Sequence, residues 1–365
     1  MKILFASIPQ PRNRFVRDLQ EGMDTHAKVV YDCDEFWSCK NNFDIVHIHE
    51  PEYLSYELEA CMNNTDPIPK ELWNRLITSL EHWKKNSKLI HTRHVQEPHV
   101  RRDDEFKKLY QTVFSYCSGI SHFANFSIAQ FKSFYPELEH IDHQVIPHQN
   151  YASLPNDISK EEARYNLNIK SDAKVMLVFG MVKEREKQLI QTAFNAMPSH
   201  NKVLLAPGWQ TKRRNIRWIR LREWVFNYEL KKALKNNKFR TNLGFIKEED
   251  AQNYCNAADV LLIPRIDELN SGNITLGFTF GLVVLGRNGG DIGEILKETK
   301  KGLVKLQNKT CSRISKIRIN LKVRGIILLE HYTEMQHKFQ DKVVVSSSTV
   351  NRALKVKKGS KAPSK

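Results

Sequence analysis

The segment from Ala258 to Asn273 joins an apolar run of strand length to a polar loop and a helix-like stretch. The apolar run ends at Pro264, and the loop carries Ser271 and Gly272 just before the helical spacing begins. Ser271 suits a helix N-cap, and Gly272 lets a ligand approach the backbone closely. Free N–H groups and the dipole at such a helix end favour a bound phosphate. The pattern therefore predicts a phosphate cradle, although a strand and a capped helix without a ligand would look similar.

A group of histidines offers proton-transfer chemistry at the end of another predicted strand. His91-x-x-His94 is followed closely by Glu97-x-His99. A neutral imidazole can accept or donate the proton that moves when a hydroxyl group attacks. Polar residues that simply end a strand are the alternative interpretation of this segment.

The residue types also allow two metal sites. His47 and His49, together with His91 and His94, could ligate a metal at the ends of two strands, as in an amidohydrolase. No third, acidic ligand stands at a recognisable spacing, so we expect no metal there. Residues 32–34 have the Asp-x-Asp spacing of a manganese site, but this pattern is common by chance.

Basic and aromatic side chains are interleaved between residues 209 and 224. Such a stretch can grip phosphates and stack bases, as a nucleic-acid or polyanion site does. An amphipathic surface insertion explains the same pattern, and contact with anionic lipid is a third interpretation. We favour the insertion and expect no nucleic-acid partner. The residues are Trp209, Lys212, Arg213, Arg214, Arg217, Trp218, Arg220, Arg222 and Trp224.

The net charge of +16 comes almost entirely from the end of the chain. From Lys301 onward, 16 Lys or Arg residues stand against three Asp or Glu residues, so the first 300 residues carry a net charge of only +3. We expect residues 301–365 to be an atypical basic tail, disordered at least over 346–365. A shifted reading frame near residue 300 is one hypothesis for its origin. A helical ending encoded in another frame would support it, and the lack of one would refute it.

Short β-like runs alternate with helical stretches along the first 300 residues, as in a doubly wound parallel sheet. Helical spacing covers residues 70–85, 161–167 and 187–195. Predicted strands of the first half are 2–8, 29–31, 44–49, 88–92, 112–116 and 145–147, and those of the second half are 175–179, 203–206, 243–245, 260–264 and 282–285.

The length of 365 residues, 41% of them hydrophobic, exceeds the usual size of one core. We therefore expect Rossmann-like domains at 1–155 and 173–300, joined by a polar linker at 156–172. Ligands bind such folds at the carboxyl ends of the strands, so a cleft facing both sheets is the expected binding place. Six scattered cysteines and the lack of an apolar run of roughly 20 residues favour a cytoplasmic protein.

Four segments, in the expected order, together resemble GT-B glycosyltransferases of the retaining group 1 class, also called family 4. The similarity is greatest to bacterial enzymes that build capsular or exopolysaccharides. It implies an N-terminal acceptor domain and a C-terminal donor domain that face a central cleft. The segments are FDIVHIHEPE (43–52), LIHTRHVQEPH (89–99), VFGMVKEREKQLIQTAF (178–194) and, within 257–296, AADVLLIP, DELNSGN and FGLVVLGRNGGDIGEIL.

The resemblance implies a loop and a helix start that bind the donor diphosphate. Fixed cations stabilise the charge that grows on a nucleoside diphosphate leaving group, so neither a metal nor a cofactor is implied. A solvated helix start is the alternative, because Glu184 and Glu186 alternate with the cations. The implied residues are Gly180, Lys183, Arg185 and Lys187 in the loop, and Ser271, Gly272 and Asn273 at the helix start.

The resemblance also implies two catalytic residues, His94 and Glu268. The family carries two glutamates around the donor sugar and ribose, of which the first matches Glu268 and the second falls on Leu276. An apolar side chain thus replaces a carboxylate that would hold ribose hydroxyls, and Asn273 could substitute for it. Further implied contacts are Gly290 and Glu294 to the donor sugar, and Glu97 and His99 on the acceptor side.

The implied function is transfer of a sugar from a nucleotide diphosphate donor to a saccharide or lipid-linked acceptor, with retention at the anomeric carbon. The implied location is the cytoplasm, with peripheral contact at an anionic membrane where a lipid-linked acceptor would lie. A polyanion-binding protein and an inactive relic of a glycosyltransferase, impaired by its unusual C-terminus, are the alternatives.

Overall fold

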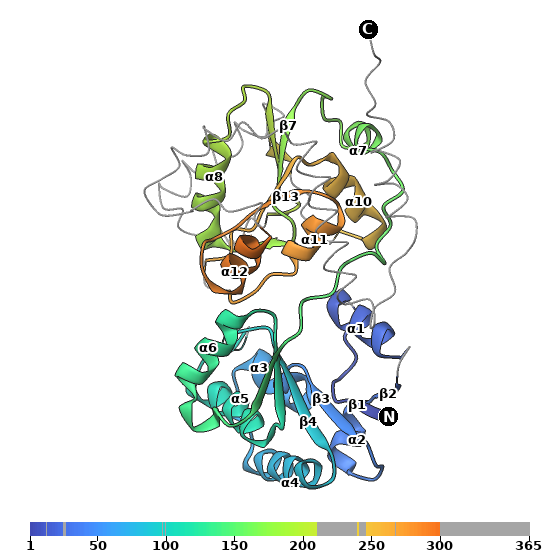
Figure 1. Ribbon diagram of the computed structural model, residues 1–365, viewed down its shortest axis with the longest axis vertical. Helices are drawn as coiled ribbons and strands as arrows, with labels where there is room; N and C mark the ends of the chain where they lie inside the picture. The colour runs from blue at the N-terminus through green and yellow to red at the C-terminus, as the bar shows by residue number, and fades with distance from the viewer. Residues whose placement is uncertain are drawn as a thin grey trace. The chain divides into compact units, whose positions relative to one another are not determined.

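The computed structural model describes residues 1–11, 13–24, 27–96, 98, 100–209, 239–240, 246–266 and 268–299. Contacts divide the chain into two compact units. The first runs from Met1 to Gln149, and the second begins at Asn150, with the short segment Glu268–Asn270 grouped with the first. Each unit contains a parallel sheet with helices packed around it (Figure 1), which confirms the predicted α/β class.

The first unit is built on a six-stranded parallel sheet in the order β2-β1-β3-β4-β5-β6. Its strands are β1 (Lys2–Phe5), β2 (Lys28–Tyr31), β3 (Ile45–Ile48), β4 (Lys88–Arg93), β5 (Gly119–His122) and β6 (Asp142–Val145). Its helices are α1 (Arg14–Asp24), α2 (Cys33–Ser38), η1 (Pro51–Tyr53), α3 (Tyr56–Asn64), α4 (Lys70–Asn86), α5 (Asp104–Tyr116), α6 (Asn125–Phe134) and η2 (Pro136–Leu138).

Residues 112–116 lie in the last turns of α5, so the strand predicted there is wrong. Their β-branched and aromatic residues favour a strand locally. The longer segment has a helical period, because Phe106, Leu109, Tyr110 and Val113 are buried on one face. Asp103 caps this helix by accepting a hydrogen bond from the N–H of Phe106 at 3.1 Å. The strand that pairs with β4 on the side away from β3 is β5, which the sequence did not predict.

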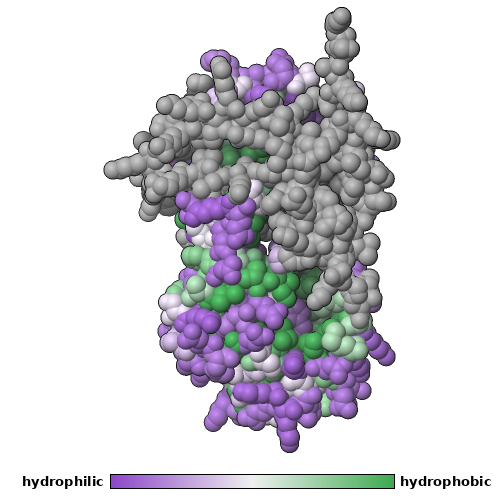
Figure 2. Space-filling model, in the orientation of Figure 1, coloured by the Kyte–Doolittle hydropathy of each residue, from purple (hydrophilic) through white to green (hydrophobic). Residues whose placement is uncertain are grey.

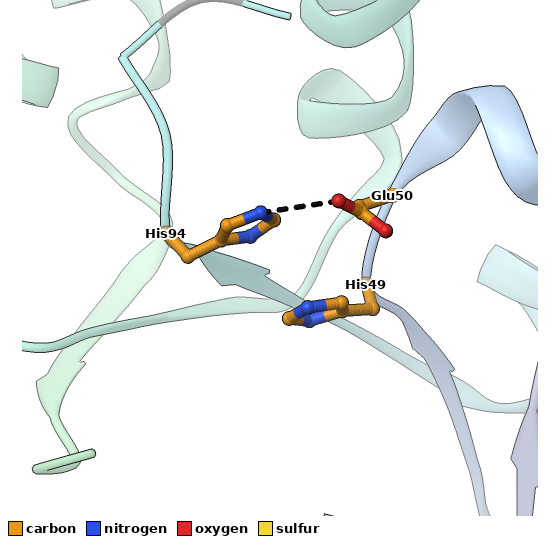
Figure 3. A group of neighbouring side chains, drawn as sticks. All are labelled: His49, Glu50 and His94. Atoms are coloured by element: carbon orange, nitrogen blue, oxygen red, sulfur yellow. Dashed lines mark ion pairs between the residues drawn. The ribbon is translucent and has the colours of Figure 1, made fainter. Parts of the chain in front are cut away.

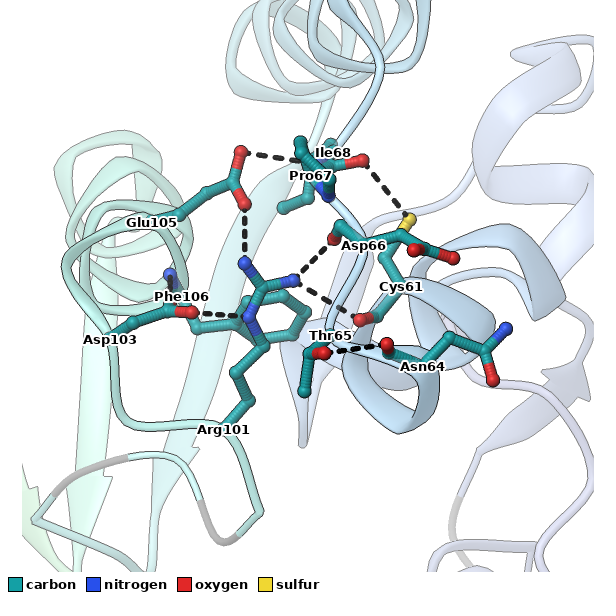
Figure 4. Close-up of polar contacts among 10 residues, drawn as sticks. All are labelled: Cys61, Asn64, Thr65, Asp66, Pro67, Ile68, Arg101, Asp103, Glu105 and Phe106. Atoms are coloured by element: carbon teal, nitrogen blue, oxygen red, sulfur yellow. Dashed lines mark hydrogen bonds and ion pairs between the residues drawn. The ribbon is translucent and has the colours of Figure 1, made fainter.

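Arg101 joins the loop after α3 to the first turn of α5 (Figure 4). Its guanidinium donates to the carbonyl oxygen of Cys61 at 3.1 Å, to that of Asp66, and to the carboxylate of Glu105 at 2.8 Å. The same carboxylate accepts a hydrogen bond from the N–H of Ile68 at 3.0 Å. One side chain therefore links the last turns of α3 and the loop after it to the start of α5.

The second unit is built on a five-stranded parallel sheet in the order β11-β9-β7-β12-β13, with a separate two-stranded pair, β8 and β10. Its strands are β7 (Lys174–Leu177), β8 (Met181–Val182), β9 (Lys202–Leu205), β10 (Gly208–Trp209), β11 (Phe239–Arg240), β12 (Val260–Leu262) and β13 (Val283–Leu285). Its helices are α7 (Lys160–Asn166), η3 (Glu184–Glu186), α8 (Lys187–Asn195), α10 (Glu248–Ala257), α11 (Asn273–Thr279) and α12 (Gly290–Glu298). The strand predicted at 243–245 and the tail at 301–365 lie outside the described residues.

Both faces of the second sheet are buried, as expected for parallel strands covered by helices. Successive residues of a strand point to opposite faces. Leu177 and Leu261 accordingly belong to one hydrophobic cluster, and Met176 and Leu262 belong to another.

Asp259, just before β12, is a polar centre within this unit. Its carboxylate accepts hydrogen bonds from the N–H of Val175 at 2.8 Å and from the guanidinium of Arg164 at 3.0 Å. The ammonium of Lys160 lies 2.5 Å from the same carboxylate. Because Lys160 and Arg164 belong to α7, Asp259 ties this helix to the sheet.

The described surface is mixed in polarity. Figure 2 shows hydrophobic residues among hydrophilic ones on the visible face of the first unit. Large exposed hydrophobic side chains of this unit include Tyr56, Phe126 and Phe134. None of the described helices is both long and apolar enough to cross a bilayer.

Candidate functional site

Loops that follow four neighbouring strands lie at the carboxyl edge of the second sheet, where α/β folds bind ligands. The loop after β7 contains Gly180 and Lys183, and Gly208 follows β9. Arg265 follows β12, and the loop after β13 leads into α12. The diphosphate-binding residues that the sequence predicts therefore belong to segments at one edge of one sheet.

The loop after β7 turns at Gly180, whose φ of +84° lies in the region that favours glycine. Gly208 of β10 pairs with Met181 of β8 beside this turn. A Cβ atom at position 208 would lie 2.0 Å from the carbonyl oxygen of Gly180. The two backbones thus approach more closely than any side chain at 208 would permit.

Arg265 fixes the next part of the same loop. Its Nη1 donates to both carboxylate oxygens of Glu186, at 2.8 and 2.6 Å, and its Nη2 donates to the carbonyl oxygen of Met181 at 3.0 Å. The Glu186 carboxylate also accepts a hydrogen bond from the N–H of Lys183 at 2.9 Å. Glu186 is fully buried, so this carboxylate depends on its partners. The pair sets the conformation of the turn that contains Lys183 and Arg185.

The three cations that the sequence assigns to a diphosphate differ in their surroundings. Lys183 is half-buried and Arg185 is exposed. Lys187 is buried, with its Nζ 2.6 Å from the Glu184 carboxylate and 5.5 Å from the centre of the Trp209 ring. Because Lys187 is buried, the half-buried Lys183 and the exposed Arg185 are more accessible to a ligand from solvent.

The prediction that Ser271 caps α11 is wrong. Gly272 occupies the N-cap position with a helical backbone, and no side chain caps this helix. The Ser271 carbonyl already accepts the N–H of Ile274 at 3.1 Å. The Nδ2 of Asn273 donates to the carbonyl oxygen of Phe179 at 2.8 Å. This bond joins the start of α11 to the loop after β7.

The other residues assigned to the donor lie on neighbouring segments. Gly290 is the buried first residue of α12, and Glu294 is half-buried in the second turn of this helix. Glu268 is half-buried in the segment before α11. Leu276 is 4% exposed and belongs to the hydrophobic core. At position 276 the fold therefore has a core residue where the resembling enzymes have a carboxylate.

In the first unit, His94 lies at the end of β4 beside a pair of buried carboxyl groups. Its Nε2 is 3.2 Å from the Oε1 of Glu50, which follows β3 (Figure 3). The side chain of His94 is 18% exposed and that of Glu50 is 7% exposed. Two residues further on, Glu52 accepts a hydrogen bond from the hydroxyl of Tyr110 at 2.7 Å.

The four histidines considered as metal ligands do not form one group. His49 stacks on His94, with ring centres 4.5 Å apart and planes 10° apart. His47 instead lies 2.8 Å from the hydroxyl of Thr92, and His91 packs edge-on against the ring of Phe114. His49 and His94 instead lie in one cluster with the carboxylate of Glu50.

Burial and neighbouring charges shift the pKa values of this group. Burial lowers the pKa of His94, but the hydrogen bond and charge of Glu50, with the charge of Glu52, outweigh it and raise the pKa overall. Burial, and then the charge of Glu50, raises the pKa of Glu52 from 4.5 to about 7. Burial lowers the pKa of His47 to about 4. His47 is therefore neutral at pH 7, whereas the surroundings of His94 favour the imidazolium.

Several predicted residues have other positions or lie outside the described part of the chain. Asp32 caps α2 by accepting the N–H of Asp34 at 2.8 Å, so this carboxylate has a structural role. Trp209 is buried in a core cluster, whereas residues 210–238, which contain the rest of the Arg/Trp stretch, are outside the described residues. Glu97 and His99 are outside them as well.

The sequence alone missed the carboxylates and the arginine that organise both sites. Glu186 alternates with cations in the way a solvated face does, yet it is fully buried. Glu50 and Glu52 stand directly after a predicted strand, which was an available indication of their role. For Arg265 the indication was a cation immediately after Pro264, at the end of the buried strand β12.

The comparisons with known proteins give structural similarity only. No protein-family model and no curated protein matches the sequence. The structure of Anabaena HepE with UDP-glucose aligns over 98% of this chain and 100% of its own, with a TM-score of 0.57 and 11% identity. Sucrose-phosphate synthase from Thermosynechococcus elongatus aligns over 96% of this chain and 80% of its own, with a TM-score of 0.55 and 13% identity. WaaG, a glycosyltransferase involved in lipopolysaccharide biosynthesis, aligns over 97% and 98%, with a TM-score of 0.52 and 14% identity. The chain therefore has the GT-B fold.

Proposed function

We propose that this chain is a glycosyltransferase that moves a sugar from a nucleotide diphosphate to a saccharide or lipid-linked acceptor, with retention at the anomeric carbon. One observation carries the proposal. The cation-bearing loop after β7 is joined to the start of α11 by the 2.8 Å bond from Asn273 to the Phe179 carbonyl. Cations and backbone N–H groups at one sheet edge are what a diphosphate leaving group needs.

The diphosphate is held by side chains rather than by a metal in this proposal. Negative charge grows on the leaving diphosphate as the glycosidic bond breaks, and prepositioned cations stabilise it without reorganisation. Lys183 and Arg185 supply this charge, while Lys187 supports the loop through Glu184. The N–H groups near Gly272 supply additional donors.

The identity of the donor base is suggested by the proteins with a similar fold. HepE has been solved with UDP, with UDP and glucose, and with UDP-glucose. UDP-sugars are therefore the first donors to test here, followed by GDP- and ADP-sugars.

His94 is the residue proposed to act on the proton that moves during transfer. The ion pair with Glu50 favours the protonated ring, which suits a proton donor or a stabiliser of negative charge better than a general base. Glu268, Gly290 and Glu294 are proposed to contact the donor sugar. Glu97 and His99 are proposed to lie on the acceptor side.

A thermal-shift screen of UDP-, GDP- and ADP-sugars tests donor binding. A donor present at 100 times its Kd stabilises the fold by about 2.7 kcal/mol, which is readily measured. The variant Arg185→Ala should reduce the shift, whereas Lys170→Ala, an exposed cation on the same unit, should not. If no nucleotide sugar shifts the transition and none is hydrolysed, the proposal is wrong.

Chelation tests the absence of a catalytic metal. Treatment with EDTA should leave nucleotide binding and sugar transfer undiminished, because side chains hold the diphosphate. A loss of transfer that Mg²⁺ or Mn²⁺ restores would contradict this part of the proposal.

A further inference from the structure

We infer that His49, Glu50 and His94 form a binding site for a zinc-like divalent cation in the first unit. The three side chains each offer one ligand atom, and these atoms all lie within 4.8 Å of one another. Two imidazoles and one carboxylate are a ligand set that proteins use for zinc with an open fourth position.

The spacing of the ligand atoms suits a small cation. Zinc bonds of about 2.0–2.2 Å in a tetrahedron place two ligand atoms about 3.4 Å apart. The Nε2 of His94 and the Oε1 of Glu50 are already 3.2 Å apart. The ring nitrogen of His49 lies within 4.8 Å of these atoms, so a side-chain rotation that brings it closer by at most about 1.4 Å completes the set.

The backbone that carries these ligands is held by the sheet. His49 and Glu50 follow β3, and His94 follows β4, which is the parallel neighbour of β3. The ring of His49 stacks on Phe15, with centres 5.1 Å apart, on the one side and on His94 on the other. Figure 3 shows His94 and Glu50 facing one another, with His49 beside them. The sheet therefore fixes the backbone of the three ligands, and cation binding requires the His49 ring to turn out of its stack on His94.

The alternative is a cluster that needs no ion, because the proton on His94 already balances one carboxylate. The ion-free and zinc-bound clusters differ in whether a proton lies between His94 and Glu50. Zinc binding removes the proton shared by His94 and Glu50 and replaces it with a metal bond to each, so it releases a proton to the buffer. The other described group of this kind, residues 32–34, is a weaker candidate because Asp32 is occupied in capping α2.

Occupation of this site would inhibit the sugar transfer proposed above, since a metal on Nε2 prevents His94 from donating a proton. This consequence depends on the proposed function, but metal binding itself does not. The two can fail separately, because binding is measured without any substrate.

The test uses the full chain, freed of metal with a chelator that is then removed. Zinc affinity is measured by calorimetry in two buffers of different ionisation enthalpy, and Co²⁺ is used as a visible spectroscopic substitute. The variants are His49→Ala and Glu50→Gln, with His140→Ala, an exposed histidine of the same unit, as the matched control.

We expect one tight zinc site with proton release in the unchanged chain and in His140→Ala. His49→Ala and Glu50→Gln should bind zinc on the order of 100-fold more weakly. Even loss of a residue that only supports a metal ligand lowers metal affinity by about 10- to 100-fold. Equal affinity in all variants, or no tight site in the unchanged chain, would overturn the inference. If His49→Ala does not fold, Glu50→Gln and its Co²⁺ spectrum decide, because an unchanged spectrum excludes Glu50 as a ligand.

Discussion

Glu52 links folding of the first unit to pH. Its carboxyl group has a pKa of about 7 in the fold against 4.5 in its absence, so the folded chain keeps a proton that the unfolded chain loses. This group therefore stabilises the fold fully below pH 4.5, and the contribution is lost as pH rises to about 7. We expect Glu52→Gln to reduce the loss of stability over this window, since glutamine can still accept the Tyr110 hydroxyl. Urea unfolding at a series of pH values measures the slope.

If the free energy of unfolding fell more steeply with pH in Glu52→Gln than in the unchanged chain, the raised pKa could not belong to Glu52. A variant that loses stability equally at all pH values would show that the Tyr110 contact, and not the protonation of Glu52, is the important property. Tyr110→Phe, which removes only the hydroxyl, separates the two contributions.

Arg265 and Arg185 provide a matched pair of substitutions on the second unit. Arg265→Ala leaves the fully buried Glu186 without its cationic partner, which should lower the free energy of unfolding by about 3–5 kcal/mol. Arg185→Ala removes an exposed cation, so stability should change by less than about 0.5 kcal/mol. Its nucleoside diphosphate affinity should nevertheless fall about 10- to 100-fold, as for a lost charged hydrogen bond.

Chemical unfolding and nucleotide titration of both variants test this pair. An unstable Arg185→Ala variant, or an Arg265→Ala variant as stable as the unchanged chain, would reverse the roles that the contacts indicate. Comparing affinity for a nucleoside monophosphate with that for the diphosphate shows whether the lost contact is to the terminal phosphate.

The candidate site was only partly accessible from sequence, because motifs locate loops but not the partners that hold them. The loop at Gly180 and the histidine at position 94 could be placed by resemblance and by their position after strands. The contact of His94 with Glu50 depends on β3 and β4 being neighbours, which is a property of the sheet. The role of Arg265 depends on residues 79 positions away in the chain. Local patterns contain no information on such pairs.

At the scale of elements, α7 is held to the sheet mainly by charge. Asp259→Ala removes the carboxylate that Arg164 and the Val175 N–H share, and the guanidinium of Arg164 is only 8% exposed. We expect a loss of about 3–5 kcal/mol, because a buried cation is left without its counter-charge. Lys160→Ala should cost less than about 1 kcal/mol, since its side chain is 40% exposed.

Guanidinium-induced unfolding of the two variants measures these differences. Similar losses for both would mean that Lys160 contributes more than its exposure suggests. Retained stability in Asp259→Ala would show that the carbonyl oxygens bound to Arg164 are sufficient to anchor the helix.

The elements with strong periodicity were predictable, and those whose local and long-range preferences conflict were not. The helix predicted at 187–195 coincides with α8, and the one at 70–85 falls one residue short of the end of α4. The error at 112–116 arose because a β-favouring pentapeptide ends a longer amphipathic helix. The strand β5 was missed because its Ser121 and His122 are polar, although the sheet buries both.

At the scale of the whole molecule, the two units have separate hydrophobic cores. One cluster contains residues between Leu4 and Ile141, and the other two contain residues between Ala163 and Leu296. Chains with several cores often unfold in more than one step. We therefore expect two calorimetric transitions, of which a nucleotide sugar raises only that of the second unit.

A donor that raises both transitions equally would show that both units contribute to its binding, and a single transition would show that the units unfold together. The variants Glu52→Gln and Asp259→Ala identify the transitions, because each changes only one core. The assignment can be made before any donor is known.

Because Gly208 closely approaches the Gly180 carbonyl, a substitution at position 208 should displace the loop after β7. Alanine there would push the Gly180–Met181 peptide aside without removing a single charge, since its methyl group would lie 2.0 Å from the oxygen. In a saturation library screened for the proposed sugar transfer, we expect glycine alone to retain activity at position 208. A Gly208→Ala variant would therefore be an inactive chain that keeps both Lys183 and Arg185.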